Sequence, residues 1–140
     1  MSGFLLDTNV VSELIRPHPS RSVGNWIEAT DESLLYLSVL TLGEIRKGIT
    51  SLLDPLRRAK LEAWLDHDLT LRFSGRILAI DHAIADRWGR LSGSPTVRKA
   101  PLPVIDGLLA ATALQHDMTL VTRDTSHLPA TGVPFLNPWI

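Results

Sequence analysis

The chain has 140 residues, 44% hydrophobic and 21% charged, so we predict that residues 1–140 form a single globular domain with one ordinary core. A net charge of −1 excludes a strong overall attraction to nucleic acid, so such binding has to come from local clusters of Lys and Arg. The sequence contains no Cys, so it has no disulfides and no thiolate metal sites. The longest apolar run is too short for a membrane span, and the N-terminal residues do not have the pattern of a secretory signal. We therefore expect a cytoplasmic protein without a membrane partner.

Short apolar runs, which predict strands, alternate along the chain with segments whose apolar residues recur at helical spacing. In chain order, they predict a strand at 4–6, a helix at 10–15, a helix after Ser20, a strand at 34–40, a helix from Thr41, a helix at 56–73, a strand at 76–80, a helix after Asp81, a helix at 103–114, and strands at 119–122 and 134–137. A loop is expected over 93–103. Strands that alternate with helices predict an α/β fold with a parallel sheet covered on both faces.

Four acidic residues lie at the ends of these predicted elements. Asp7 and Asp124 follow strands, Asp106 lies in the first turn of an apolar helix, and Glu44 lies near the start of another helix. In open α/β sheets, ligands bind at the carboxyl ends of the strands. We therefore expect Asp7 and Asp124 to share one edge of the sheet, with Asp106 facing that edge from a helix start.

Each of these acids also has a purely structural explanation. Glu44 completes a capping box with Thr41, Asp106 is favourable beside a helix N-terminus, and Asp7 and Asp124 can serve as caps or turn residues. Taken singly, none of the four requires a functional role.

A cluster of all four has a stronger consequence. Carboxylates about 5 Å apart repel by on the order of 3 kcal/mol per ionised pair at an effective dielectric near 20. The cluster must therefore bind a cation or hold protons at raised pKa values. Ligands that are all oxygen, with no Cys or His among them, favour Mg²⁺ or Mn²⁺, the ions used in phosphoryl chemistry.

Four motifs in this order resemble the PIN domain, and within it the VapC-type toxins of type II toxin–antitoxin systems, most closely the FitB-like subgroup. The motifs are Leu5-Leu6-Asp7-Thr8-Asn9, Ser38 with Glu44, Asp106 followed by Ala110-Ala111-Thr112-Ala113, and Thr122-Arg123-Asp124. The similarity extends to the closing residues 135–139 and so covers essentially the whole chain.

The resemblance implies a three-layer α/β/α sandwich with a mainly parallel central sheet, a homodimer, and Mg²⁺-dependent endoribonuclease activity, with Mn²⁺ as a substitute. It also implies a cognate antitoxin of the VapB or FitA type that blocks the acidic pocket, and a larger toxin–antitoxin assembly on operator DNA. The residues that match the family's acidic quartet, as catalytic and metal-binding groups, are Asp7, Glu44, Asp106 and Asp124. The residues that match the small polar groups orienting those acids or bound water are Thr8, Asn9 and Thr122.

No motif identifies a residue that binds substrate. The candidate basic residues for contacts with RNA phosphates are Arg46, Lys47, Arg98 and Lys99. Ordinary surface charge is the favoured interpretation of each. The five His residues lack ligand spacing, and only His127 lies near the acids in sequence.

Two other classes of protein are alternatives to a nuclease for this sequence. A haloacid-dehalogenase-like phosphatase or a receiver domain would also use an Asp after a strand. The first needs a second Asp where this chain has Asn9, and the second places its Asp later in the chain. The other alternative is a catalytically weak or inactive protein that binds its antitoxin in a complex on operator DNA, and the sequence does not separate that role from a nuclease.

Overall fold

The computed structural model describes residues 3–140, so the first two residues of the predicted 1–140 domain lie outside the described part. Five strands, all paired in parallel, form one sheet in the order β3-β2-β1-β4-β5. The strands are β1 (Phe4–Leu6), β2 (Leu35–Ser38), β3 (Ile77–Leu78), β4 (Thr119–Val121) and β5 (Phe135–Leu136). The predicted α/β fold with a parallel sheet is confirmed.

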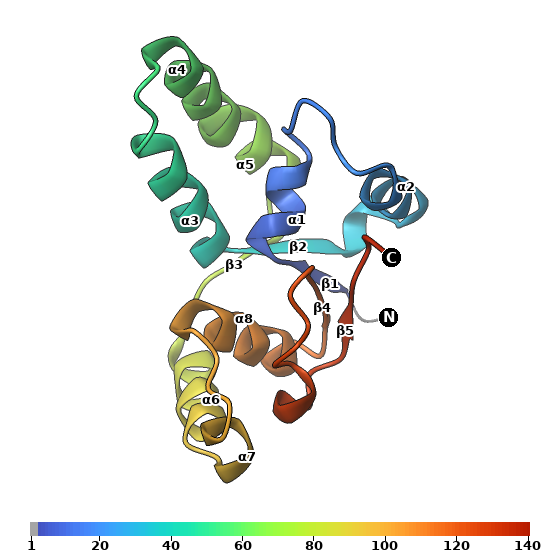
Figure 1. Ribbon diagram of the computed structural model, residues 1–140, viewed down its shortest axis with the longest axis vertical. Helices are drawn as coiled ribbons and strands as arrows, with labels where there is room; N and C mark the ends of the chain where they lie inside the picture. The colour runs from blue at the N-terminus through green and yellow to red at the C-terminus, as the bar shows by residue number, and fades with distance from the viewer. Residues whose placement is uncertain (1–2) are drawn as a thin grey trace.

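Helices cover both faces of this sheet, which makes the three-layer α/β/α sandwich (Figure 1). The first group lies above the sheet in Figure 1 and consists of α1 (Thr8–Glu13), α2 (Arg21–Ala29), α3 (Val39–Thr50), α4 (Pro55–Ala63), the π-helical turn η2 (Trp64–Leu69) and α5 (Thr70–Arg72). The second group lies below it and consists of α6 (His82–Ser92), α7 (Pro95–Arg98) and α8 (Val104–Gln115). Short 3-10 turns, η1 (Glu32–Leu34) and η3 (Pro129–Thr131), complete the chain.

The alternation of side chains along β1 divides the core in two. Leu6 packs with residues of α1, α2, α3 and η2, whereas Leu5 packs with residues of α8 and with Met118 and Leu120. Successive residues of a strand point to opposite faces, so a fully apolar strand fills both layers. None of the helices within residues 3–140 combines the length and apolarity needed to cross a bilayer.

The order of the strands creates a switch point between β1 and β4. From β1 the chain continues to β2 on one side, and it later returns to place β4 on the other side of β1. Ligands of open α/β sheets bind in the crevice that such a reversal opens at the carboxyl ends of the strands. Asp7 follows β1 directly, and Asp124 comes three residues after Val121, the end of β4.

The predicted start of α3 is wrong by two residues. The strand predicted over 34–40 ends at Ser38, whose Oγ accepts a hydrogen bond from the backbone N–H of Leu40 (3.1 Å) and thereby caps the helix. Thr41 therefore lies inside α3 and is fully buried, so the capping box predicted between Thr41 and Glu44 does not form. A strand that runs into an apolar helix start leaves no change of pattern at the boundary.

Other boundaries also differ from the prediction. The loop predicted over 93–103 contains α7, because Ser94 caps it and Pro95 has the backbone angle that a first helical residue needs. The first helix begins at Thr8, two residues earlier than predicted, and the outer strands β3 and β5 pair over two residues each. The helix predicted after Asp81 is confirmed, and Asp81 caps it, since its Oδ1 accepts the N–H of Ile84 at 2.9 Å.

Candidate active site

An acidic pocket lies at the switch point between β1 and β4. Its polar lining comes from three segments far apart in the chain and consists of Asp7, Asp106, Thr122, Asp124 and His127. Its apolar wall consists of Leu102, Leu109, Leu120 and Leu128. The structure thus brings three of the four predicted acids into one pocket, as well as the one His that the sequence placed near them.

Two hydrogen bonds fix the carboxylate of Asp7. Its Oδ1 accepts the backbone N–H of Thr8 (2.6 Å), as the cap of α1, and its Oδ2 accepts the hydroxyl of Thr122 (2.7 Å). The Thr122 side chain is buried, and its oxygen also accepts the N–H of Asp124 at 3.1 Å and Nδ2 of Asn9 at 3.4 Å. One hydroxyl therefore ties the end of β1 to the loop after β4.

Glu44 joins the same network through α1. The hydroxyl of Thr8 donates to Oε1 of Glu44, and the hydroxyl oxygen of Thr41 lies 3.3 Å from Thr8 Oγ1. Thr41 was interpreted from the sequence only as a helix cap, so its place beside Thr8 was missed. No sequence signal links the two, because the contact joins residues 33 positions apart.

The pKa values of Asp7 and Asp106 are both raised, in part by the charges of neighbouring carboxylates. Burial is the largest cause of the raised pKa of Asp7, and the nearby charges of Glu44 and Asp124 raise it further, against the lowering effect of its hydrogen bonds. Burial also raises the pKa of Asp106, with added repulsion from Asp7, Asp124 and Glu44, while His127 opposes the shift. Carboxylates that raise one another's pKa favour an arrangement that supplies positive charge.

The donor set fits a hard divalent cation in its chemistry. Within residues 3–140, no three Asp, Glu or His side chains lie close enough together to hold a metal ion as they stand. The four acids supply only oxygen ligands, and a cation among them would relieve their repulsion. In addition, the Oδ1 of Asn9, a neighbour of this network, is buried and accepts no hydrogen bond from the described residues.

The basic residues predicted as candidate phosphate contacts do not line the acidic pocket. Arg46 pairs with Asp66 and Glu62 on neighbouring helices, which supports its interpretation as surface charge. Lys47, Arg98 and Lys99 are exposed, and none lines the acidic pocket.

The metal-free Asp7→Asn variant is expected to unfold with a free energy equal to or above that of the wild type at neutral pH. A carboxyl whose pKa is raised in the folded state binds its proton more tightly there, so its ionisation destabilises the fold as pH rises from the ordinary value of 3.8 through the raised value. Asn keeps the helix cap without the charge. The advantage of Asn should therefore be absent below this window and fully present above it.

Urea unfolding in EDTA at a series of pH values measures this difference. If the variant were clearly less stable than the wild type at pH 7, Asp7 would instead be a structural residue whose charge the fold needs.

The fold and pocket together define a class of protein: a parallel α/β/α sandwich with carboxylates gathered at the switch point of its sheet. The chain belongs to the PIN-domain family, whose sequence model matches residues 4–132. It is 36% identical over 135 residues to the toxin FitB of Neisseria gonorrhoeae, covering 96% of this chain and 97% of that one. It is also 35% identical over 135 residues to the VapC ribonuclease Y4jK of Sinorhizobium fredii, covering 96% of each.

Solved structures agree with this assignment. The crystal structure of FitAcB from Neisseria gonorrhoeae contains a chain that is 36% identical, with a TM-score of 0.92 over 97% of this chain and 98% of that one. The DNA-bound VapBC of Salmonella typhimurium, at 21% identity and a TM-score of 0.76, covers 99% of both chains and shows the shared fold.

Proposed function

We propose that this protein is the toxin component of a type II toxin–antitoxin system and acts in the cytoplasm as a metal-dependent endoribonuclease. The observation that supports this best is the pocket at the switch point, where Asp7 and Asp106 have raised pKa values because of burial and of the other acids. The curated relatives named toxin FitB and VapC ribonuclease support the same activity.

In this proposal Asp7 and Asp106 chiefly hold Mg²⁺, or Mn²⁺ in its place, and Glu44 and Asp124 complete the site. The ion, when bound, would polarise an RNA phosphate and lower the pKa of a water molecule. Glu44 and Asp124 position the water for in-line attack on the phosphodiester.

Thr8, Asn9 and Thr122 act as positioning residues in this proposal. Thr8 holds Glu44, and Thr122, with Asn9 beside it, holds Asp7 and the backbone of Asp124. Ligating carboxylates need such outer hydrogen bonds to keep their orientation.

The Thr122→Val variant is expected to cleave RNA about 10- to 100-fold more slowly than the wild type, because Asp7 and Asp124 lose a shared hydrogen-bond partner. The Thr122→Ser variant keeps the hydroxyl and should restore most of the rate, although it lacks the methyl group. Initial rates over a titration of Mg²⁺ test this, and the Val variant should need more metal. Equal rates in the Val and Ser variants would contradict the positioning role.

The partner in this proposal is a VapB- or FitA-type antitoxin that neutralises the toxin, with the toxin as a homodimer inside a larger complex on operator DNA. Chains with TM-scores of 0.92 and 36% identity occur in the solved structures titled FitAcB and "FitAB bound to IR36 DNA fragment", which supports this partner class.

Incubation of a mixed RNA pool with the antitoxin-free protein tests the activity, with Mg²⁺ in one arm and EDTA in the other. Cutting only in the Mg²⁺ arm is expected, and the fragment ends would identify the target sequence. The second candidate function is a partner-binding protein without turnover, which is favoured by the absence of a ready-made metal cluster among the described residues. No cutting in the Mg²⁺ arm, or in a further arm with Mn²⁺, would contradict the nuclease and leave that candidate in its place.

A further inference from the structure

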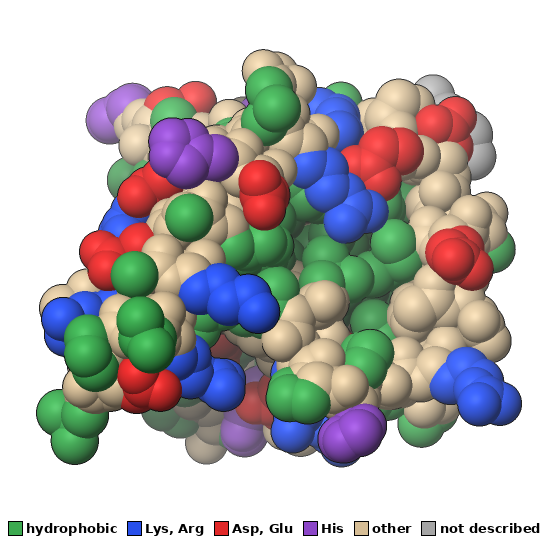
Figure 2. All heavy atoms as spheres, turned by 90° about the horizontal axis from the view of Figure 1, so that it is seen from above, with side chains coloured by type: hydrophobic (Ala, Val, Ile, Leu, Met, Phe, Trp, Pro, Cys, Tyr) green, Lys and Arg blue, Asp and Glu red, His purple; other side chains and the backbone are tan. Residues whose placement is uncertain are grey.

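A second cavity, of about 550 Å³, opens beside the acidic pocket. It lies between α1, the loop that follows α1, α4, the loop after β4 and the C-terminal residues. Its lining includes three arginines from three different segments, Arg16, Arg57 and Arg123, together with Asn9 and Trp139. Figure 2 looks onto this side of the molecule and shows a hollow with a hydrophobic floor, bordered by Lys and Arg side chains and also by Asp and Glu side chains.

The cavity is joined to the acidic pocket by the chain itself. Asn9 lines the cavity, and its Nδ2 donates to Thr122, which holds Asp7. Arg123 lies between Thr122 and Asp124 in sequence, so one loop contributes to both sites. A nucleic acid strand that follows this loop would therefore meet both sites with neighbouring phosphates.

The charge of the cavity is positive and only partly neutralised. Glu13 is buried and forms an ion pair with Arg16 at 3.3 Å, while its other oxygen accepts the N–H of Ser20. Arg57 and Arg123 are both exposed, and within residues 3–140 neither forms an ion pair with a carboxylate. Two guanidinium groups thus stay available for an anionic ligand, although the whole chain has a net charge of −1.

The indole ring of Trp139 orients the guanidinium group of Arg123. The guanidinium carbon of Arg123 lies 5.2 Å from the ring centroid of Trp139, which itself packs against the core. A cation held over an indole ring keeps its charge and its hydrogen-bond donors. Trp139 therefore orients Arg123 without neutralising it, as a binding site for phosphate requires.

We propose that this cavity binds the backbone phosphates of single-stranded RNA next to the phosphate that is cleaved, with Arg57 and Arg123 as the contacting residues. The inference rests on the proposed nuclease function and adds the place where the substrate is held. Phosphate contacts from Arg position a nucleic acid strand and contribute affinity without regard to sequence. Sequence preference would then arise elsewhere in the site.

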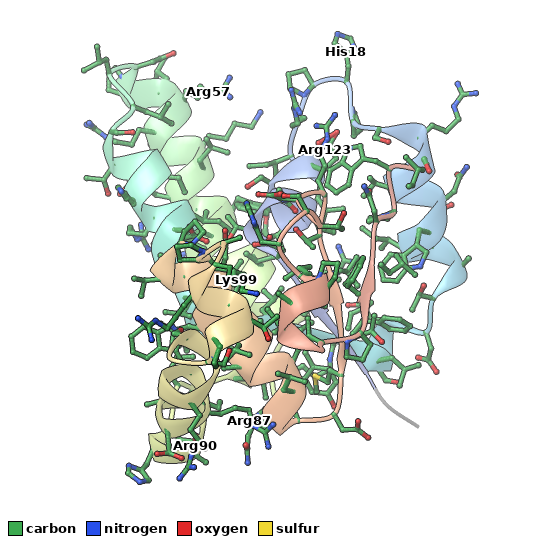
Figure 3. The ribbon with its side chains drawn as sticks, turned by 60° about the horizontal axis from the view of Figure 1, so that its bottom comes forward. His18, Arg57, Arg87, Arg90, Lys99 and Arg123 are labelled. Carbon is green, nitrogen blue, oxygen red and sulfur yellow. The ribbon has the colours of Figure 1, made fainter. Side chains whose placement is uncertain are left out.

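The test compares two double variants that lose the same charge. One is Arg57→Ala with Arg123→Ala, and the control is Arg87→Ala with Arg90→Ala, which lie at the opposite end of the molecule in Figure 3. Binding of a fluorescent single-stranded RNA to the antitoxin-free protein is measured by anisotropy in EDTA, where cleavage is prevented, at several salt concentrations. Binding of the antitoxin is measured in parallel.

The cavity variant should bind RNA about tenfold or more weakly, and the slope of log affinity against log salt should fall by about 0.7 for each lost phosphate contact. The control should stay within about twofold of the wild type, which excludes an effect of net charge alone. Equal losses in both variants would overturn the proposal, as would unchanged RNA binding. Loss of antitoxin binding with unchanged RNA binding would identify the cavity as a protein-docking surface.

These outcomes are separate from a failure of the proposed function. If the wild type cleaves RNA in Mg²⁺ and the cavity variant binds and cleaves equally well, the nuclease stands and the RNA-binding cavity is wrong. If the wild type neither binds nor cleaves RNA, both proposals are wrong.

Discussion

RNA cleavage by the Asp7→Asn variant is expected to be at least about 10³-fold slower than by the wild type, the scale seen when one member of a catalytic unit is removed. Asp7 lies at the end of β1, its two oxygens are held by Thr8 and Thr122, and its pKa is raised by burial and by neighbouring acids. Asn has nearly the same shape and keeps the cap of α1, so the fold should remain while the charge for a cation is lost.

The matched control is Asp86→Asn. Asp86 is an exposed acid on α6 that pairs with Arg90 at 2.8 Å and lies outside the acidic pocket. Its variant should cleave RNA within about twofold of the wild type, because exposed ion pairs contribute little. Initial rates with antitoxin-free proteins at saturating Mg²⁺ measure both variants, and equal rates for Asp7→Asn and wild type would remove Asp7 from the catalytic site.

The Leu109→Ala variant is expected to lower the free energy of unfolding by about 2–5 kcal/mol. Leu109 lies in α8, one turn after Asp106, and is only 1% exposed between the sheet and the acidic pocket. Its truncation removes apolar burial and leaves a cavity in a core whose neighbours are small, among them Ala110 and Ala113.

Leu53→Ala is the matched control for this change. Leu53 is 95% exposed in the turn before α4, so its truncation should change the free energy of unfolding by less than about 0.5 kcal/mol. Urea unfolding followed by circular dichroism measures both. A small effect at Leu109 would mean that α8 is held by other contacts and that Asp106 does not depend on this packing.

Much of the fold was predictable because its signals are local. The apolar runs at 4–6 and 119–122 and the helical spacing over 56–73 each reflect burial of one short segment. Alternation of these segments was enough to predict a parallel sheet covered on both faces. The boundaries at Ser38 and within 93–103 were wrong because the pattern at a strand-to-helix junction, or in a loop rich in Pro and Ser, does not show where a cap forms.

The sequence by itself determined that acids follow the ends of two central strands and that a third lies in the first turn of a buried helix. Only the tertiary structure decided which residues surround those acids. The hydrogen bond from Thr122 to Asp7 joins residues 115 positions apart. The cavity beside the acidic pocket combines Arg57 of α4 with Arg123 of the loop after β4. The physical reason is that such contacts depend on the order of the strands and the packing of helices across them. Local periodicity specifies which face of an element is buried, but not which other element covers it.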